Sequence, residues 1–230
     1  LLLRAEDEDG QRMPLQLLRD EVMTLLLAGH DTTANGLTWT WSLLAQHPSV
    51  VNQLRAEDNK TDSSFPHSDA APFAQKVIKE SMRLFPPVYL FGREAMNSLQ
   101  LGDFPIRKGD SVVMSQWIVH RDESYFPDPL VFDPDRWSAE LERTLPKYAY
   151  FPFGGGPRVC IGKEVAMLEA TTVMGILASR FDLSLEEPEK LTPWPTVTLR
   201  PQDSVWAKVR KVPQGPSNSC NLQTTREGHQ

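Results

Sequence analysis

The sequence is poor in cysteine: its 230 residues include only Cys160 and Cys220, which lie far apart in the chain. Two isolated cysteines do not build the disulfide framework of a small secreted protein, so a reducing compartment such as the cytoplasm is the better interpretation. Neither cysteine has a Cys or His neighbour at zinc-site spacing, which argues against a tetrahedral zinc centre. What remains to be explained is the role of Cys160.

The sequence also lacks an excess of positive charge and a long apolar run. Its 24 Lys and Arg residues are outnumbered by 30 Asp and Glu residues, and the net charge of −6 argues against a general nucleic-acid binder. The most apolar stretch, residues 22–46, contains His30, Asp31 and Asn35 and is a poor membrane span. We find no signal peptide. Because the chain opens on Leu1 rather than Met, we expect a piece of a longer protein, with a membrane anchor in a preceding segment as an open alternative.

Hydrophobic periodicity and turn residues predict a mainly α-helical fold with small β-sheets, an α+β class. The expected helices span residues 15–46, 49–57, 72–84 and 162–179, and the expected strands span residues 99–101, 104–106 and 111–115. Residues 196–201 and 205–212 suggest a final hairpin. Residues 120–157 are mostly loop, and a loop of that length usually carries function. The polar segment 213–230 is expected to be disordered.

The stretch "FPFGGGPRVCIG", residues 151–162, combines three glycines with a lone cysteine. One interpretation is an inert core cysteine beside a flexible turn. In the other, Gly154, Gly155 and Gly156 permit positive φ and close approach by a flat ligand. Cys160 then precedes a helix whose N-terminus stabilises a thiolate, and Arg158 adds positive charge. A thiolate is a metal ligand, and an axial thiolate on a haem iron needs only one cysteine.

At this motif the sequence resembles the cytochrome P450 superfamily. The haem-binding loop of that family is matched at every defined position by Phe153-Gly154-x-Gly156-x-Arg158-x-Cys160-x-Gly162. The resemblance implies that Cys160 is the axial ligand of the haem iron and that Arg158 pairs with a haem propionate. It also implies that Phe153 lies against the haem and that Gly162 lets the following helix pack closely.

The middle of the long expected helix carries a second motif, Ala28-Gly29-His30-Asp31-Thr32-Thr33. Glycine and threonine are costly inside a helix, so the motif indicates either a kink used for packing or a widened turn whose hydroxyl relays protons. The family has an Ala/Gly-Gly-x-Asp/Glu-Thr-Thr/Ser pattern in its distal helix. The resemblance implies that Thr32 orients protons towards dioxygen, that Asp31 delivers them, and that Ala28 and Gly29 leave room for oxygen and substrate.

A third motif is Glu80-x-x-Arg83, in which the two residues share one face of the expected helix. The pattern is weak alone, since Glu140-x-x-Arg143 repeats it. The pair Glu80 and Arg83 is the better match, because it lies on a predicted helix that ends in "LFPP", as the Glu-x-x-Arg helix of the family does. The resemblance adds Arg136, from "FDPDRW", and implies a structural network of Glu80, Arg83 and Arg136 that holds the haem loop. We interpret Glu140 and Arg143 as a surface pair.

Other positions rest on the family pattern alone. Arg93 is either a second propionate ligand or an ordinary exposed arginine. The candidates for lining the substrate site, each equally well explained as core, are Leu25, Val88, Leu90, Phe91 and Val197. We assign no chemistry to His120 and Arg121.

The resemblance covers residues 1–212, which would form the C-terminal part of a P450 catalytic domain, from the distal helix through the haem loop. It implies a haem-thiolate monooxygenase that uses haem b and dioxygen to hydroxylate a small apolar substrate. Electrons would come from NAD(P)H through a ferredoxin or flavoprotein reductase docked on the cysteine face. On that face, Lys76, Lys79, Arg158 and Lys163 would attract an acidic partner.

Two alternatives remain open at this point. One is a peroxide-driven enzyme of the same fold, although the retained Asp31-Thr32 pair favours oxygen activation. The other is a truncated or degenerate haem-binding fragment without activity of its own.

Overall fold

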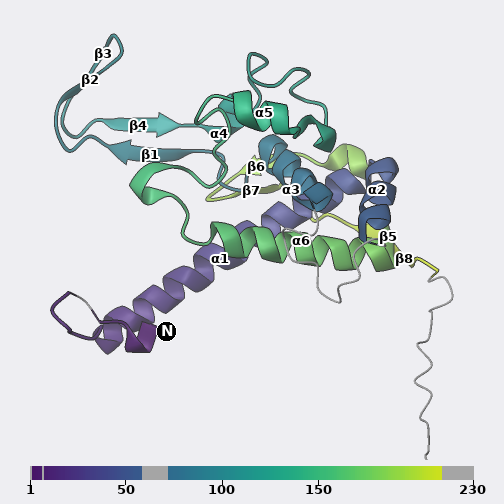
Figure 1. Ribbon diagram of the computed structural model, residues 1–230, viewed down its shortest axis with the longest axis horizontal. Helices are drawn as coiled ribbons and strands as arrows, with labels where there is room; N and C mark the ends of the chain where they lie inside the picture. The colour runs from purple at the N-terminus through teal and green to yellow at the C-terminus, as the bar shows by residue number, and fades with distance from the viewer. Residues whose placement is uncertain (1, 7, 59–71, 214–230) are drawn as a thin grey trace, which may run out of the picture.

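The computed structural model describes residues 2–6, 8–58 and 72–213 (Figure 1). Its α-helices are α1 (Leu15–Leu44), α2 (Pro48–Asp58), α3 (Pro72–Leu84), α4 (Gln116–Val119), α5 (Ala139–Thr144) and α6 (Lys163–Arg180). Short 3-10 helices span Leu2–Arg4, Pro134–Arg136, Gly156–Arg158 and Pro188–Lys190. The ends of the four expected helices agree with those of α1, α2, α3 and α6 to within two residues. The mainly α-helical class is confirmed, and the predicted disordered tail, beyond Pro213, falls outside the described residues.

The core forms where α2, α3 and α6 pack around the C-terminal half of α1 (Figure 1). Helix α3 is strongly amphipathic because Phe73, Val77, Ile78 and Leu84 recur on one helical face, and all four side chains are buried. Leu44 from α1 and Met174 from α6 complete the same cluster. This packing fixes α3 and α6 against α1. Two of the motifs found in the sequence lie on α1 and α3, and the third lies on the loop that leads into α6.

The strands form four two-stranded antiparallel pairs. Strand β1 (Phe91–Glu94) pairs with β4 (Ser111–Met114), and β2 (Leu99–Leu101) pairs with β3 (Phe104–Ile106). Strand β5 (Phe181–Leu185) pairs with β8 (Ala207–Lys211), and β6 (Pro193–Pro195) pairs with β7 (Leu199–Pro201). The predicted final hairpin is therefore wrong: residues 199–201 and 207–211 belong to different pairs. Strand β7 pairs with β6, which directly precedes a tight turn, and β8 pairs with β5, which directly follows α6. The residue types of such short strands say little about which strand is their partner.

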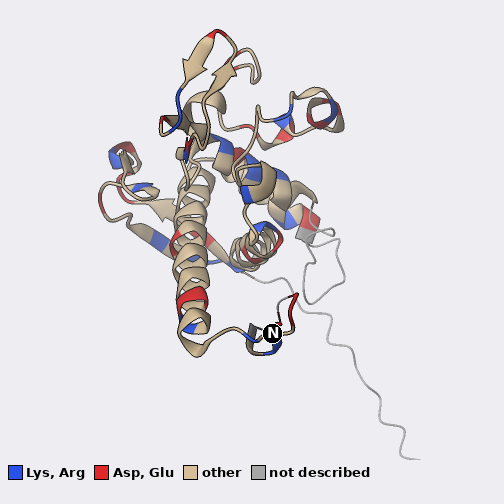
Figure 2. Cartoon of the chain, turned by 90° about the vertical axis from the view of Figure 1, so that its left-hand side faces the viewer, with Lys and Arg blue, Asp and Glu red and all other residues tan. Residues whose placement is uncertain are grey.

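The backbone of α1 is regular α-helix through the Ala28–Thr33 motif, so the widened turn that one interpretation required is absent there. Between Val22 and Leu44 it carries a single charged residue, Asp31. The long upright helix in Figure 2 is accordingly mostly tan, the colour of residues other than Lys, Arg, Asp and Glu. Its N-terminal half is exposed although it is apolar, with Leu26 and Leu27 both more than half exposed. In the described part of the chain, no helix combines the length and hydropathy that crossing a membrane would need.

Candidate active site

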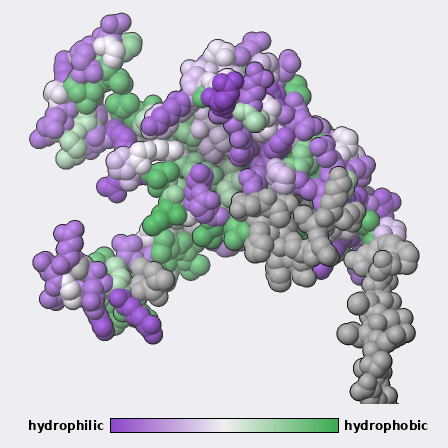
Figure 3. Space-filling model, viewed as in Figure 1, coloured by the Kyte–Doolittle hydropathy of each residue, from purple (hydrophilic) through white to green (hydrophobic). Residues whose placement is uncertain are grey.

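A cavity of about 440 Å³ lies between α1, α3, β1 and the loop that leads into α6. Figure 3 shows hydrophobic side chains gathered in the hollow between the β2–β3 hairpin and the first turns of α1, on the same side of the molecule. The lining is mostly apolar and includes Leu37, Ile78, Met82 and Met167. All three sequence motifs lie on the elements that build this cavity, and two of them reach it.

The glycine-rich loop presents Cys160 to the cavity. Gly154 and Gly156 have φ of 71° and 68°, a left-handed conformation that residues with a Cβ rarely adopt. Two backbone hydrogen bonds close the loop, from Cys160 N–H to the Phe153 carbonyl at 3.0 Å and from Val159 N–H to the Gly156 carbonyl at 3.1 Å. Cys160 is exposed and lies two residues before Gly162, the N-cap of α6. The thiol therefore stands at the positive end of an 18-residue helix.

Helix α1 presents small and hydroxyl-bearing residues to the same cavity. Ala28, Gly29 and Thr32 all line it. A Cβ added at Gly29 would meet nothing within 4 Å, so this glycine is not required for packing within the described chain. The Thr32 hydroxyl donates to the Ala28 carbonyl at 2.7 Å, a bond to the preceding helical turn. Its proton is thus engaged, while its oxygen remains able to accept a hydrogen bond from the cavity.

Asp31 does not line the cavity. Its Oδ2 instead accepts a hydrogen bond from the Thr198 hydroxyl at 2.7 Å, on the turn between β6 and β7. The Asn35 side-chain amide donates to the same hydroxyl oxygen at 3.1 Å. The adjacent motif residues Asp31 and Thr32 therefore point in different directions, one to the hairpin and one to the cavity.

Glu80, Arg83 and Arg136 meet in the interior, and the first two are fully buried. Both carboxylate oxygens of Glu80 accept from Arg83 at 2.9 Å, and Oε1 also accepts from Arg136 at 3.3 Å. The indole N–H of Trp137 adds a bond to Glu80 at 3.0 Å, and the backbone N–H of Asp133 adds one at 3.1 Å. Neither of these last two donors is indicated by the Glu-x-x-Arg pattern.

Arg83 also fastens the long loop that precedes the cysteine. Its guanidinium donates to the carbonyls of His120 at 2.9 Å, Pro129 at 2.6 Å and Val131 at 3.1 Å. A fork of five N–H donors suits such a cluster of carbonyls. The carboxylate of Glu80 and the carbonyls of the loop thus surround one buried cation.

His120, for which no role was predicted, is fully buried and accepts a hydrogen bond at Nε2 from the backbone N–H of Phe151 at 2.9 Å. Burial lowers the pKa of His120 to about 3; the nearby backbone of Met82 opposes this shift, and the charges of Arg83 and Arg121 add to it. The ring is therefore neutral at physiological pH. It connects the start of the cysteine loop to the residues that Arg83 holds.

Arg121, the neighbour of His120, is also engaged rather than free. Its guanidinium donates to the Leu84 carbonyl and lies over the Trp117 ring, 3.3 Å from the centroid. Burial, reinforced by the charge of Arg83, lowers the pKa of Arg121 to about 9. This contact joins α4 to the end of α3.

Most of the residues that the sequence analysis singled out are brought together at the cavity. Those that line it are Leu25, Ala28, Gly29, Thr32, Val88, Phe91, Arg93, Phe153, Gly154, Arg158, Cys160 and Gly162. Gly156 shapes the loop without lining the cavity. Both Arg93 and Arg158 are exposed, and the Arg93 guanidinium lies 4.8 Å from the Phe91 ring centroid.

Two of the residues predicted to line a substrate site, Leu90 and Val197, do not line this cavity. Leu90 is 43% exposed, whereas its neighbours Val88 and Phe91 both line the cavity. Val197 is 96% exposed, since it sits at the tip of a turn closed by a hydrogen bond from Thr196 N–H to the Thr198 carbonyl at 3.1 Å.

The basic residues predicted to attract a redox partner on the cysteine face differ in whether they already form ion pairs within the chain. Lys79 forms an ion pair with Glu142 of α5, and exposed Lys163 lies 3.6 Å from Glu164. Arg158 is exposed beside the cysteine. Lys79 is therefore a weaker candidate for partner attraction than its sequence position indicated.

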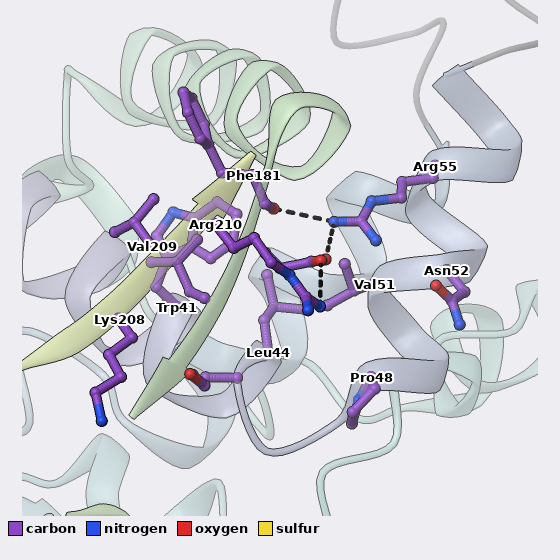
Figure 4. A pocket seen from close by; sticks show the side chains of 14 residues that line it. Trp41, Leu44, Pro48, Val51, Asn52, Arg55, Phe181, Lys208, Val209 and Arg210 are labelled. Carbon is purple, nitrogen blue, oxygen red and sulfur yellow. Dashed lines mark hydrogen bonds and ion pairs between the residues drawn. The ribbon is translucent and has the colours of Figure 1, made fainter. Parts of the chain in front are cut away.

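A second cavity, of about 470 Å³, lies between α1, α2 and the β5–β8 pair (Figure 4). Its charged groups serve the fold: Arg55 donates to the carbonyls of Ala178 and Phe181 and to Asp182, and Arg210 donates to Asp182 as well. Nothing in this arrangement resembles the convergence of thiol, hydroxyl and guanidinium groups in the first cavity. We therefore take the first cavity as the candidate active site.

Comparison with known proteins agrees with this geometry. The family model described as cytochrome P450 matches residues 1–206. Cyclooctatin synthase of Streptomyces melanosporofaciens is 39% identical over 203 residues, covering 86% of this chain and 44% of that protein. Human cytochrome P450 4V2 is 34% identical over 221 residues, covering 92% of this chain and 42% of that protein.

Solved structures show the same fold. A retinoic acid-bound cyanobacterial CYP120A1 superimposes with a TM-score of 0.87 at 34% identity, covering 92% of this chain and 50% of that one. A second cytochrome P450 structure, CYP102L1, gives a TM-score of 0.84 at 29% identity, covering 92% of this chain and 49% of that one. The chain thus spans less than half the length of the curated relatives it matches. The match of the family model over nearly the whole described chain, together with the fold, shows that this chain belongs to the cytochrome P450 family, whose members are haem-containing monooxygenases.

Proposed function

We propose that this chain provides the haem side of a monooxygenase active site. In the overall reaction, a substrate C–H bond and one molecule of dioxygen, with two electrons and two protons, give an alcohol and one molecule of water. The observation that carries the proposal is that Cys160 and Thr32, from separate elements, line one apolar cavity.

The residues at the cavity fit a haem. A haem is flat and apolar except for its two propionates and its metal, and the cavity offers apolar walls with a single thiol. The described residues include no group of three or more His, Cys, Asp or Glu side chains suited to hold a metal ion, so a site with one protein ligand agrees with the donor set. We assign Cys160, which precedes the N-terminus of α6, as the thiolate ligand.

The guanidinium groups of Arg158 and Arg93 are the proposed partners of the propionates. Both line the cavity, and both reach solvent, where a propionate group would lie. Bidentate pairing with carboxylates is the chemistry for which a guanidinium is best suited. Phe153 and Gly154, which also line the cavity, would let the loop lie close to the macrocycle.

Bound haem supplies the redox chemistry, with the thiolate favouring cleavage of the O–O bond. The chain's own residues manage space and protons. Ala28 and Gly29 leave room at α1, and the Thr32 oxygen accepts a hydrogen bond from a protonated group or water in the cavity, since its own proton is held by Ala28. Asp31 is the proposed source of protons for that position.

The proposed substrate is a small apolar molecule of a lipid-like, terpenoid or aromatic kind. Support comes from the apolar lining, which includes Leu25, Val88 and Phe91. It also comes from relatives, because one solved structure holds retinoic acid and one human relative, 33% identical, is an ultra-long-chain fatty acid omega-hydroxylase.

Electrons are proposed to come from NAD(P)H through a separate ferredoxin or flavoprotein reductase. Lys76, Arg158 and Lys163 would attract its acidic surface, with Lys79 contributing less because it is paired with Glu142. The low cysteine content supports a reducing, cytoplasmic setting for this chemistry.

A second candidate is a chain that binds haem without turnover. It is favoured by the exposure of apolar side chains near the cavity, such as Leu25 at 48% and Ile161 at 91%. Such exposure would admit water to a site where monooxygenation needs water to be excluded.

One experiment separates the two candidates. The chain is loaded with haem and given NADPH, a ferredoxin with its reductase, and isotopically labelled ¹⁸O₂, with retinoic acid and a long-chain fatty acid as trial substrates. One labelled oxygen atom in a hydroxylated product supports the monooxygenase. Haem uptake with no labelled product from any substrate supports the second candidate.

A further inference from the structure

The carboxylate of Asp31 is held by a residue 167 positions away in the sequence, Thr198. Thr198 is 7% exposed, and its hydroxyl contacts two side chains that lie one turn apart on α1. Thr198 belongs to none of the three motifs and does not line the cavity. Its position is a product of the tertiary fold alone.

The hydrogen bonds at Thr198 have a fixed direction. A hydroxyl has one proton, and a carboxylate only accepts, so that proton points at Asp31. The oxygen of Thr198 must then accept from Asn35, whose amide nitrogen lies 3.1 Å away. The Asn35 amide thus donates to the Thr198 hydroxyl, and the Thr198 hydroxyl donates to the Asp31 carboxylate.

Thr198 is also rigidly supported. The adjacent Leu199 N–H donates to the Pro87 carbonyl at 2.8 Å, and the Leu199 carbonyl accepts from the Trp39 indole at 2.9 Å. Tyr89 donates to the carbonyl of Thr196, at the other side of the turn, at 2.9 Å. The turn between β6 and β7 is thus fastened to the same segment that supplies Val88 to the cavity. A hydroxyl on such a support can hold a partner in one orientation.

We propose that Thr198, oriented by Asn35, is the positioning residue that fixes the Asp31 carboxylate for proton delivery to Thr32. The proposal rests on the proposed monooxygenase function. Asp31 lies next to Thr32 on α1 but faces the hairpin, so its orientation decides whether a proton taken up on the hairpin side can pass to the cavity side. Without the Thr198 hydroxyl, the carboxylate loses its fixed partner and the proton supply becomes rate-limiting.

The test compares Thr198→Val, which keeps the shape and removes the hydroxyl, with Thr198→Ser, which restores it. Thr196→Val is the matched control, because its hydroxyl bonds within the same turn, to the Thr198 carbonyl at 2.9 Å, and does not contact Asp31. Haem-loaded protein is supplied with NADPH, ferredoxin and reductase, and product is measured against hydrogen peroxide released. We expect Thr198→Val to lower product per NADPH by the same factor as Asp31→Asn, with kcat reduced and KM unchanged. Thr198→Ser and Thr196→Val should behave as the unaltered protein.

A second readout needs neither haem nor turnover. The midpoint of urea unfolding is measured for Thr198→Val, Asp31→Asn and the double variant. The contact predicts that the double variant shifts by less than the sum of the single shifts. Additive shifts would overturn the proposal. So would a Thr198→Val protein that keeps its product yield while Asp31→Asn loses it. Unchanged yields in both Asp31→Asn and Thr32→Val would overturn the proposal as well, because neither residue would then take part in proton delivery. The proposed function itself fails only if the unaltered, haem-loaded chain forms no hydroxylated product.

Discussion

The backbone N–H of Phe151 donates to Nε2 of His120 at 2.9 Å, and this bond fastens the first residue of the cysteine loop to a ring with no solvent exposure. The carbonyl of His120 in turn accepts from Arg83 at 2.9 Å. One histidine thus joins the Glu80–Arg83 pair to the loop that carries Cys160. We infer that it helps to hold that loop in shape before any cofactor binds.

Replacing His120 by Phe should destabilise the chain by about 1–3 kcal/mol, because the Phe151 N–H would be left buried without an acceptor. His120→Gln offers a side-chain oxygen and should recover part of the loss. Urea unfolding measures both variants, and hydrogen exchange at the Phe151 amide should quicken in the phenylalanine variant only. Equal free energies of unfolding for His120→Phe and the unaltered chain would contradict the role we give to this histidine.

The same histidine predicts a pH dependence of stability. Its pKa is about 3 in the folded chain, against about 6.5 when unfolded, so below pH 6.5 the unfolded state binds a proton that the folded state does not. The stability that His120 contributes is therefore complete above pH 6.5 and is lost as the pH falls towards 3, by at most about 1.4 kcal/mol per pH unit.

This dependence is measured by urea unfolding between pH 7.5 and pH 5. Part of the decline should disappear in His120→Gln, which does not titrate. A variant with the same pH profile as the unaltered chain would show that other groups cause the decline.

The chain offers a direct comparison between a buried Glu-x-x-Arg motif, at Glu80, and an exposed one, at Glu140. Glu80→Gln removes the charge that compensates Arg83 and Arg136, and we expect a loss of about 3–5 kcal/mol in the free energy of unfolding. Glu140→Gln makes the same change at an exposed position and should stay within about 0.5 kcal/mol of the unaltered chain. Similar losses in the two variants would mean that burial does not set the importance of the pair.

Thr32→Val tests the proton handling proposed at the cavity. The variant keeps the shape of the side chain but removes the oxygen that accepts from the cavity, and product formation should fall by about 10²-fold. Thr38→Val is the matched control, since the Thr38 hydroxyl makes the same kind of bond, to the Ala34 carbonyl at 2.8 Å, away from the cavity. Haem content should be the same in both variants. A Thr32→Val protein that forms product at the normal rate would remove Thr32 from the reaction.

Motifs confined to one stretch of chain could be read from the sequence. The loop from Phe153 to Gly162 depends on glycines whose positive φ is a local property, and Glu80 with Arg83 depends on helical spacing. The limits of α3 followed in the same way from its apolar periodicity and the Pro86-Pro87 stop. Family membership rested on these local patterns and is confirmed.

What depends on distant contacts could not be read in this way. Phe151 and His120 are 31 residues apart, and Asp31 and Thr198 are 167 apart, so tertiary packing alone makes them partners. For the same reason, neither the pairing of β5 with β8 nor the exposure of Leu90 could be predicted from the sequence. The spacing of residues in the sequence indicates which functional groups share one helix or one loop. It does not indicate which hydroxyl or ring from a distant part of the chain will contact them.

The central claim is that Cys160 is the thiolate ligand of a haem, and the absorption spectrum of the reduced carbon monoxide complex tests it most directly. The haem-loaded chain is reduced, exposed to carbon monoxide and compared with Cys160→Ser. We predict the red-shifted Soret band of a thiolate-ligated haem in the unaltered chain and its loss in the serine variant. A Cys160→Ser protein that retains the red-shifted band would contradict the assignment.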